Sequence, residues 1–267
     1  MARQTVRPAA AVFAVTSDAD LPASLENGFD VWFSAPGSCR QRNAGLEFVK
    51  GRADVIAFFD DDYIPSSYCI EGIAAFFTAY PDVVAANGTL LADGINSPGI
   101  PYADALTMVS DRDSFRSEPI GVLSRLSGLY GCNMAFRASA IGDERFDERL
   151  PLYGWQEDID FAARIGRHGA IVKTDYFYGV HQGVKKGRTS GVRLGYSQVA
   201  NPLYLIRKGT MRTSEALPLM LKNILKNHAR AFAPEPWVDR LGRCRGNWLA
   251  VIDVLRRRDD PGNIVSM

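Results

Sequence analysis

Long apolar segments are absent from this chain of 267 residues. The longest run without a charged residue spans only 13 positions, 194–206, and includes a proline and an asparagine. Because a spanning helix needs about 20 mainly apolar residues, the sequence predicts no membrane-spanning helix. The apolar run 9–15 follows two arginines, as in a secretory signal, but it is short and has no small-residue cleavage site. We expect a buried first strand there.

Cysteine and histidine are scarce, with four and three residues respectively. No two cysteines form a Cys-x-x-Cys pair, and none lies at zinc-site spacing from a histidine. The composition, 46% hydrophobic and 23% charged, is that of a globular protein and excludes disordered, collagen-like and disulfide-rich classes. We therefore expect reduced thiols in a cytosolic protein. The cysteines are Cys39, Cys69, Cys132 and Cys244.

Charge is distributed unevenly, although the net charge is only +1. Residues 1–175 carry 15 basic and 24 acidic side chains, whereas residues 176–267 carry 16 and 6. A basic C-terminal third on an acidic body indicates an anionic partner, such as phosphate groups, nucleic acid or a membrane surface. The alternative is a solvated basic face. Nucleic acid fits least well, because the basic segment lacks interleaved aromatic residues that would stack on bases.

Apolar strand-like runs alternate with amphipathic helical segments along the first two thirds of the chain. This alternation predicts an α/β fold with a mostly parallel sheet and helices on both faces. We expect a catalytic domain at 1–210 and a basic helical appendage at 211–267. The segment 93–124, rich in glycine, proline and polar residues, gives no clear prediction. Expected strands are 9–15, 30–33, 54–59, 83–87, 131–137 and 170–174, the last leading to the aromatic run before His181, and expected helices are 20–27, 40–51, 68–80 and 154–166.

Three consecutive carboxylates follow the apolar run 55–59, at Asp60, Asp61 and Asp62. Ligands bind at the carboxyl ends of strands in parallel α/β sheets. Like charges this close repel one another unless a positive group neutralises them. A hard divalent cation such as Mg²⁺ or Mn²⁺ could neutralise these carboxylates, because it prefers oxygen ligands and often binds phosphates at the same time. The alternative is a solvated acidic turn.

Two further features carry candidate chemistry. Asp158 stands in the first turn of an expected helix, where it either serves as a general base or only caps the helix dipole. His181 follows an aromatic run and is a metal-ligand candidate, although a lone histidine is commonly structural. Lys185, Lys186 and Arg188 alternate with glycines, a pattern suited to a loop that grips phosphates.

Taken in order, these segments resemble family-2 inverting glycosyltransferases of GT-A fold, a Rossmann-like nucleotide-diphospho-sugar transferase fold. The resemblance covers about residues 9–208. It departs from the family after the second strand, where the usual acidic residue is absent from 34–38. The motifs are Arg42-Asn43-Ala44-Gly45, Asp54 to Pro65, Gly131 to Arg137, Phe146-Asp147-Glu148, and Gly154-Trp155-Gln156-Glu157-Asp158.

The resemblance implies a role for each matched residue. Asp60 and Asp62 would contact the nucleotide and the metal, His181 would complete the metal and diphosphate site, and Asp158 would be the base. The implied donor site also includes Thr16, Arg42, Asn43 and Asp61. The acceptor side takes Asn133, Trp155 and Glu157, with Trp155 offering an apolar face to a sugar ring.

The sequence thus predicts a metal-dependent inverting hexosyltransferase that moves a sugar from a nucleotide-diphospho-sugar to a carbohydrate or lipid-linked saccharide. Bacterial surface polysaccharide assembly is the expected setting. Two alternatives stay open: an Asp-x-Asp phosphatase or phosphotransferase with Asp60 as nucleophile, and a non-catalytic sugar-nucleotide-binding module.

The C-terminal segment contains an amphipathic helical pattern with basic residues beside it. Such a helix can lie on the anionic inner face of the cell membrane, or it can pack on the catalytic domain. Periodicity does not separate the two interpretations. The apolar positions are Leu217, Met220, Leu221, Ile224, Leu225, Ala229 and Phe232, and the basic ones are Lys222, Lys226 and Arg230.

Overall fold

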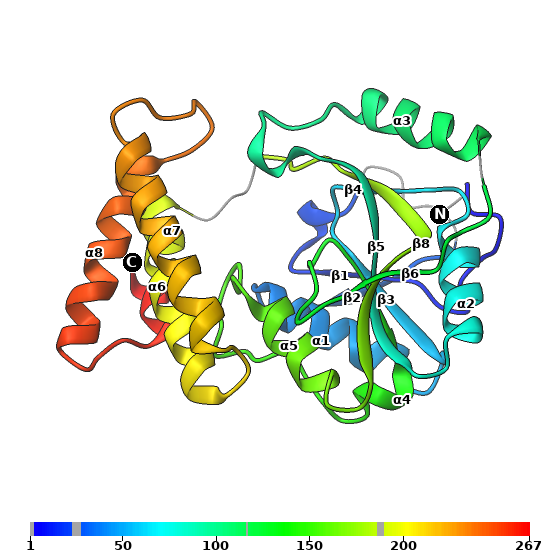
Figure 1. Cartoon of the computed structure of the whole chain (residues 1–267), viewed down its shortest axis with the longest axis horizontal. Coiled ribbons are helices and arrows are strands. Elements are labelled where there is room, and N and C mark those ends of the chain that lie inside the picture. The colour runs from blue at the N-terminus through cyan, green and yellow to red at the C-terminus, as the bar shows by residue number, and fades with distance from the viewer. Residues whose placement is uncertain (1–2, 23–27, 116, 186–189) are drawn as a thin grey trace. The chain divides into compact units, whose positions relative to one another are not determined.

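The computed structural model describes residues 3–22, 28–115, 117–185 and 190–267, and its elements are shown in Figure 1. The chain forms two compact units. The first comprises residues 1–35, 41–145 and 164–185, and the second comprises residues 36–40, 146–163 and 186–267. This division does not coincide with a boundary at residue 210, because the helix before that point packs with the two helices after it.

A six-stranded sheet forms the centre of the first unit, with the strand order β3-β7-β5-β8-β4 and with β6 paired to β8. Strands β1 and β2 pair in parallel as a separate two-stranded sheet. The strands are β1 (Val12–Val15), β2 (Asp30–Phe33), β3 (Val55–Phe59), β4 (Tyr63–Pro65), β5 (Val83–Asp93), β6 (Val122–Arg125), β7 (Asn133–Arg137) and β8 (Ala170–His181).

The α/β class is confirmed, but the expectation of a mostly parallel sheet is wrong. Strands β3, β5 and β8 run in the same direction, as the strand–helix alternation predicts. Strand β7 runs oppositely between β3 and β5, and both β4 and β6 are antiparallel to β8. The turn from β3 to β4 is only three residues long. Strand β4 leaves this turn in the direction opposite to β3 and pairs with β8 rather than with β3.

Helices pack on the sheet through apolar clusters. Helix α2 (Cys69–Ala79) buries Phe76 and Phe77 against Phe177 of β8, and α3 (Tyr102–Ser114) buries Val109 against Val180. Helix α3 comes from the segment that gave no prediction. The remaining helices up to β8 are α1 (Ser38–Val49), α4 (Ala138–Ile141) and α5 (Glu157–Ile165).

The second unit contains three long helices around a small apolar core that includes Tyr196 and Ala250. Helices α6 and α8 approach closely at two glycines, since a Cβ on Gly195 or Gly246 would lie 2.2 or 2.0 Å from a carbonyl oxygen of the other helix. No helix in the described part of the chain is long and apolar enough to cross a membrane. These helices are α6 (Gly191–Lys208), α7 (Thr213–Arg230) and α8 (Arg240–Leu255).

Two smaller expectations are also resolved. All four cysteines are free, and three of them are buried, as expected of core thiols. The helix expected at 20–27 falls mostly on residues 23–27, which lie outside the described residues. What is described before them is a single 3₁₀ turn at Asp18–Asp20.

We predict that Gly72→Ala in α2 destabilises the protein and that Gly45→Ala in α1 does not. A Cβ on Gly72 would lie 1.9 Å from the carbonyl oxygen of Tyr176, whereas the nearest atom to one on Gly45 is 4.0 Å away. Overpacking against backbone should cost about 1–3 kcal/mol. Replacing an uncrowded helical glycine by alanine should raise the free energy of unfolding by about 0.5–1 kcal/mol, because the unfolded chain loses flexibility. Urea unfolding of both variants measures the difference, and equal stabilities would contradict the close packing of α2 on β8.

Candidate active site

The acidic triplet lies in the tight turn between β3 and β4. The backbone amide of Tyr63 donates to the carbonyl oxygen of Asp60 at 3.1 Å, which closes the turn. The rings of Phe59 and Tyr63, on either side of it, stack at a centroid distance of 5.3 Å. The amide of Asp60 also donates to the carbonyl oxygen of Cys132 at 3.3 Å, just before β7. The turn therefore holds the three carboxylates at the carboxyl end of β3.

The end of β8 brings His181 to this turn. In the antiparallel register of β4 and β8, Tyr63 lies opposite His181. The imidazole Nε2 lies 3.3 Å from Oδ1 of Asp62. The backbone just after β8 also binds Asp62, since the amide of Gln182 donates to its carbonyl oxygen at 2.9 Å and the amide of Val184 to Oδ2 at 2.8 Å. Strand pairing, rather than proximity in sequence, joins these groups.

A second carboxylate contacts the other side of the same imidazole. Strand β5 runs parallel to β8 and places Asp93 opposite His181. Oδ1 of Asp93 lies 2.7 Å from Nδ1 of His181, and the hydroxyl of Tyr130 lies 3.2 Å from that nitrogen. Histidine ligands of metals usually donate the second ring N–H to a carboxylate, which fixes the tautomer and the ring orientation. Asp93 therefore holds the ring so that Nε2 faces Asp62.

The charges of these groups are strongly coupled. Burial acts to lower the pKa of His181, but its hydrogen bonds and charge interactions with Asp62 and Asp93 outweigh burial and raise the pKa. Burial acts to raise the pKa of Asp62, but the contacts from His181 and the Val184 amide outweigh it and lower the pKa. The two carboxylates therefore favour the protonated form of His181, and that imidazole in turn favours the ionised form of Asp62.

Asp61 shows the cost of crowding acids in one turn. Its pKa is raised, first by desolvation and then by the negative charges of Asp62 and Asp60. The pKa of the buried Cys132 thiol is also raised, first by burial and then by the negative charges of the surrounding carboxylates. Nη2 of Arg42 lies 3.0 Å from Oδ1 of Asp60 and compensates part of this charge.

The residues fit a divalent cation. One ligand atom each from Asp60, Asp62 and His181 can be chosen so that all lie within 4.8 Å of one another. Two carboxylates and an imidazole are ligands that suit Mn²⁺ and related divalent ions. A cation bound here would lie between Nε2 of His181 and the carboxylate of Asp62, which are 3.3 Å apart. The predicted metal ligands are thus brought together, whereas Asp61 is not among them.

The predicted base, Asp158, lies at the start of α5 in the second unit, where its Oδ1 accepts from the amide of Ile159 at 2.8 Å. The loop before it is held in unusual backbone conformations, with φ of 56° at Leu152 and 76° at Gln156. Non-glycine residues in this region cost energy and concentrate at functional sites. Hydrogen bonds fix the loop, because Asn201 donates to the carbonyl oxygen of Trp155 at 2.7 Å and Ser38 donates to that of Tyr153 at 3.0 Å.

Two other predicted acceptor residues are largely enclosed. Glu157 and Asn133 are 6% and 1% exposed, and the side chain of Asn133 accepts a hydrogen bond from Asn87 at 3.0 Å. Asn133 thus contributes to the interior behind the triplet. Trp155 is half-buried. The acceptor roles of all three residues stay predictions.

The remaining predicted donor-site residues lie at several places in the first unit. Thr16 follows β1, and its hydroxyl and amide donate to the carboxylate of Asp20 at 2.6 and 2.8 Å. Asn43 is half-buried in α1, one residue after Arg42. Lys185 donates to the carbonyl oxygens of Gly94 and Ile95 at 2.9 and 3.0 Å, next to Asp93. Lys186 and Arg188 lie outside the described residues.

Sequence reasoning missed Asp93 and Tyr130. No local signal in the sequence indicates Asp93, because only the pairing of β5 with β8 places it opposite His181. The expected strand 83–87 also stops short of Asp93, whereas β5 continues to it. In the structure Gly88 lies within the strand, where a Cβ would be 2.4 Å from the ring of Phe177. This glycine marks close packing rather than a strand end.

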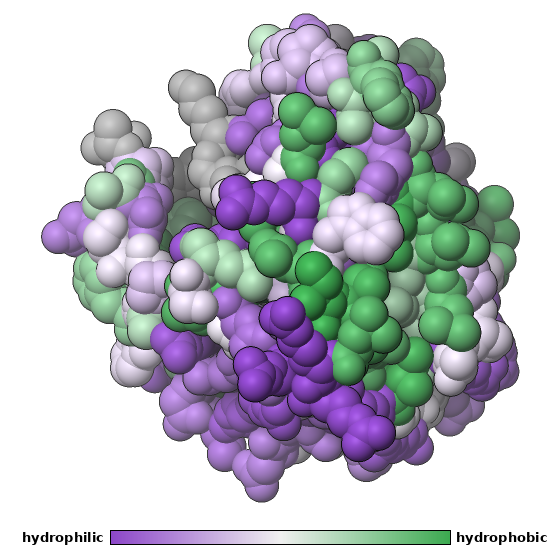
Figure 2. All heavy atoms as spheres, turned by 90° about the vertical axis from the view of Figure 1, so that its left-hand side faces the viewer, coloured by the Kyte–Doolittle hydropathy of each residue, from purple (hydrophilic) through white to green (hydrophobic). Residues whose placement is uncertain are grey.

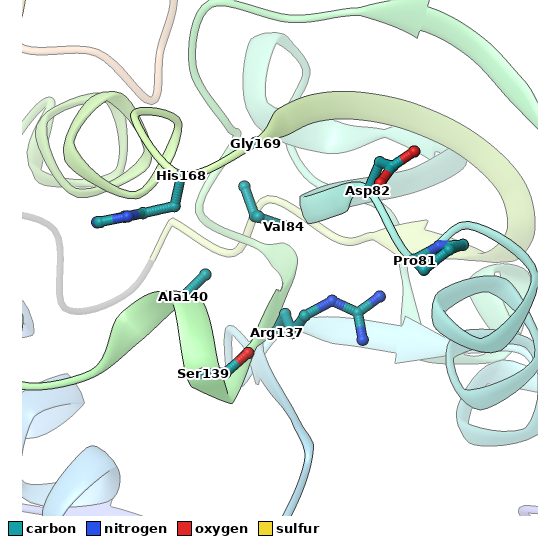
Figure 3. Close-up of a pocket in the computed structure, with 8 residues that line it drawn as sticks. All are labelled: Pro81, Asp82, Val84, Arg137, Ser139, Ala140, His168 and Gly169. Atoms are coloured by element: carbon teal, nitrogen blue, oxygen red, sulfur yellow. The ribbon is translucent and has the colours of Figure 1, made fainter.

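A cavity lies at the end of the sheet away from the acidic triplet. Its volume is about 400 Å³, and residues at the starts of β5 and β8 and the end of β7 line it (Figure 3). Because β5 runs from Val83 to Asp93, this cavity and the acidic triplet are at opposite ends of the strand. Its basic side chain, Arg137, is already bound to backbone carbonyl oxygens of α2 and the residues after it. Nothing in the cavity resembles the cluster around His181.

Comparison with known families matches residues 34–143 to the family described as glycosyl transferase family 2. The matched segment includes Arg42, Asn43 and the acidic triplet. This match agrees with the α/β class and with the resemblance found in the sequence. The sequence matches no curated protein.

Comparison with solved structures finds weakly similar chains. A crystal structure of GalNAc-T7 with UDP, GalNAc and Mn²⁺ is 12% identical, with a TM-score of 0.42 over 90% of this chain and 45% of that one. Structures of Staphylococcus aureus TarS 1–349, without and with UDP, are 14% and 15% identical. Each has a TM-score of 0.40 over 77% of this chain and 56% of that one. The chain thus spans about half the length of these structures.

We predict that the protein binds Mn²⁺ at one site and that Asp62→Asn or His181→Ala abolishes most of this binding. Each substitution removes one of the three grouped ligand atoms. Isothermal titration calorimetry with Mn²⁺ alone measures the affinity, and circular dichroism verifies that the variants are folded. Unchanged affinity in both variants would contradict the assignment.

A second prediction concerns Asp93→Asn. It should weaken Mn²⁺ binding about tenfold or more, since losing the carboxylate behind a metal-bound histidine has effects of about 10–100-fold. Asp104→Asn makes the same chemical change on the exposed face of α3 and serves as the control. Equal affinities for the two variants would show that Asp93 does not orient His181.

Proposed function

We propose that this protein is a metal-dependent glycosyltransferase that moves a sugar from a nucleotide-diphospho-sugar to an acceptor hydroxyl with inversion at the anomeric carbon. The observation that carries the proposal is the grouping of Asp60, Asp62 and His181 at the carboxyl end of β3. The family match over residues 34–143 includes two of these three residues and supports the same class of reaction.

The first unit supplies the proposed donor site. A divalent ion held by Asp60, Asp62 and His181 would supply Lewis-acid stabilisation of the negative charge that develops on the departing diphosphate. Arg42 holds Asp60 through its ion pair, and Asp93 orients His181. Asn43 and Thr16 are proposed to contact the nucleotide. Lys185, with Lys186 and Arg188, is proposed to add positive charge near the phosphates.

Asp158 is the proposed base. It takes the proton from the acceptor hydroxyl while that oxygen attacks the anomeric carbon from the face opposite the diphosphate, which inverts the configuration. A carboxylate suits this task because it is ionised at neutral pH and can be held rigidly by the first turn of a helix. The strained, hydrogen-bonded loop 152–156 supports the proposal, since it fixes the backbone that leads into this turn.

The proposed acceptor is a carbohydrate or a lipid-linked saccharide, and the proposed setting is polysaccharide assembly in the bacterial cytoplasm at the inner face of the cell membrane. Trp155 would offer an apolar ring face to the acceptor sugar. The neighbouring crystal structures that contain UDP, and in one case Mn²⁺ and GalNAc, suggest the first donors and ions to test.

We predict that one nucleotide-sugar raises the melting temperature of the protein and that the rise requires Mn²⁺ or Mg²⁺. A ligand that binds only the folded state stabilises it in proportion to the logarithm of its concentration over Kd. A thermal-shift panel of nucleotide-sugars, each with Mn²⁺ and with a chelator, makes the measurement. A metal-independent rise would contradict the shared site, and transfer of phosphate to Asp60 would instead identify a phosphotransferase.

For Asp158→Asn we predict unchanged donor binding and a loss of turnover of about 10²–10⁴-fold, the usual contribution of a general base. Asp143→Asn makes the same change at an exposed residue paired with Lys50 and should keep full activity. Initial rates with the donor found by thermal shift give kcat and KM separately. Full activity in Asp158→Asn would remove the base assignment.

A further inference from the structure

Helix α7 carries two separate apolar stripes. Met220 and Ile224 pack into the core that includes Tyr196 and Ala250. Leu217, Leu221 and Leu225, spaced four residues apart, form a second stripe and remain 50–59% exposed. Helix α7 therefore packs within its unit through one stripe and leaves the other on the surface.

Helix α8 extends this exposed stripe. Trp248, Ile252 and Leu255 recur at helical spacing and are 39–80% exposed. The two helices are joined at this face by Trp248, whose indole Nε1 donates to Nε2 of His228 at 3.0 Å. His228 lies one turn after Leu225 on α7. Figure 2, in which the side of the molecule bearing α7 and α8 faces the viewer, shows green apolar side chains gathered together and bordered by purple ones.

The border of the apolar face is basic. The exposed cationic residues of α7, α8 and the segment after them are Lys222, Lys226, Arg230, Arg245, Arg256, Arg257 and Arg258.

Acids are fewer in this segment, because residues 213–258 contain four acidic and nine basic residues. Glu215 is exposed in the first turn of α7. Glu235 pairs with Arg240 at 2.8 Å, Asp239 accepts from the amide of Gly242, and Asp253 accepts from the hydroxyl of Tyr196. The segment that carries the apolar face therefore has an excess of positive charge.

We propose that this face of α7 and α8 docks the protein on an anionic lipid bilayer. Leucines would enter the acyl-chain boundary, the tryptophan would lie at headgroup level, and the basic residues would contact lipid phosphates. Charge complementarity selects this occupant, because two copies meeting through the same face would bring like charges together. The inference rests on the membrane setting proposed above and names the surface of the protein that would contact the membrane.

Flotation of the full-length protein with vesicles tests the proposal without using catalysis. Vesicles of phosphatidylcholine alone are compared with vesicles that also contain phosphatidylglycerol, at low and high salt. The wild type should float with the anionic vesicles, and high salt should release it. Lys222→Glu with Lys226→Glu should lower the partition coefficient at least about tenfold, since each surface charge contributes about fivefold.

The apolar stripe has its own variant, Leu221→Gln with Leu225→Gln, which should also bind at least about tenfold more weakly because two buried leucines are lost. Arg167→Glu and Met108→Gln make the same kinds of change at exposed residues of the first unit and should bind as the wild type does. Thermal shift with donor should be unchanged in every variant, so a failed donor assignment would be seen separately.

Three results would overturn the proposal. The wild type would fail to float with anionic vesicles, the two control variants would weaken binding as much as the patch variants, or sedimentation would show a dimer that the leucine variant converts to a monomer without any lipid binding. The last result would assign the face to self-association.

Discussion

The candidate site depends on one imidazole ring held between two carboxylates. His181 contacts Asp62 through Nε2 and Asp93 through Nδ1. Asp93 lies on β5, His181 on β8 and Asp62 in the turn just before β4, and the pairing of β4 and β5 with β8 brings the three together. A shift of one residue in either pairing would turn the side chain to the other face of the sheet. The strand pairing is therefore the constraint on which the proposed donor chemistry rests.

The same arrangement concentrates negative charge that the proposed cation would neutralise. Asp60, Asp61 and Asp62 occupy one short turn, and the charges of Asp60 and Asp62 contribute to raising the pKa of Asp61. Arg42 offsets part of the charge of Asp60, and Asp62 and Asp93 both contact the imidazole of His181. A divalent ion bound by Asp60, Asp62 and His181 would neutralise the carboxylates and offer a positive charge to a diphosphate. The crowded carboxylates, which would destabilise an ordinary turn, are thus the groups proposed to bind the cation.

Much of this could be predicted from the sequence, because the strongest signals are local. The apolar run before the triplet located β3, and the periodicity of 68–80 located α2 within one residue at each end. Strand direction could not be predicted, since it depends on which neighbour each strand meets in space. For the same reason Asp93 was missed, because only the pairing of β5 with β8 joins it to His181.

The C-terminal helices show a second limit of sequence patterns. The apolar positions of α7 form one broad face in the sequence, yet Met220 is packed in the core while Leu221 is exposed. The placement of α6 and α8, whose side chains form the core that contacts Met220 and Ile224, distinguishes the buried stripe from the exposed one. Which of the two apolar stripes of a helix is buried depends on its tertiary contacts, and the periodicity of the sequence does not predict it.

Electron–nuclear double resonance of the Mn²⁺-loaded protein tests the central claim most directly, because it identifies the nuclei bound to the metal. The account predicts a ¹⁴N coupling from the imidazole that disappears in His181→Ala, and a ³¹P coupling that appears when a nucleoside diphosphate is added. A Mn²⁺ signal without nitrogen coupling, or one that a bound diphosphate leaves unchanged, would contradict a metal site shared by His181 and the donor.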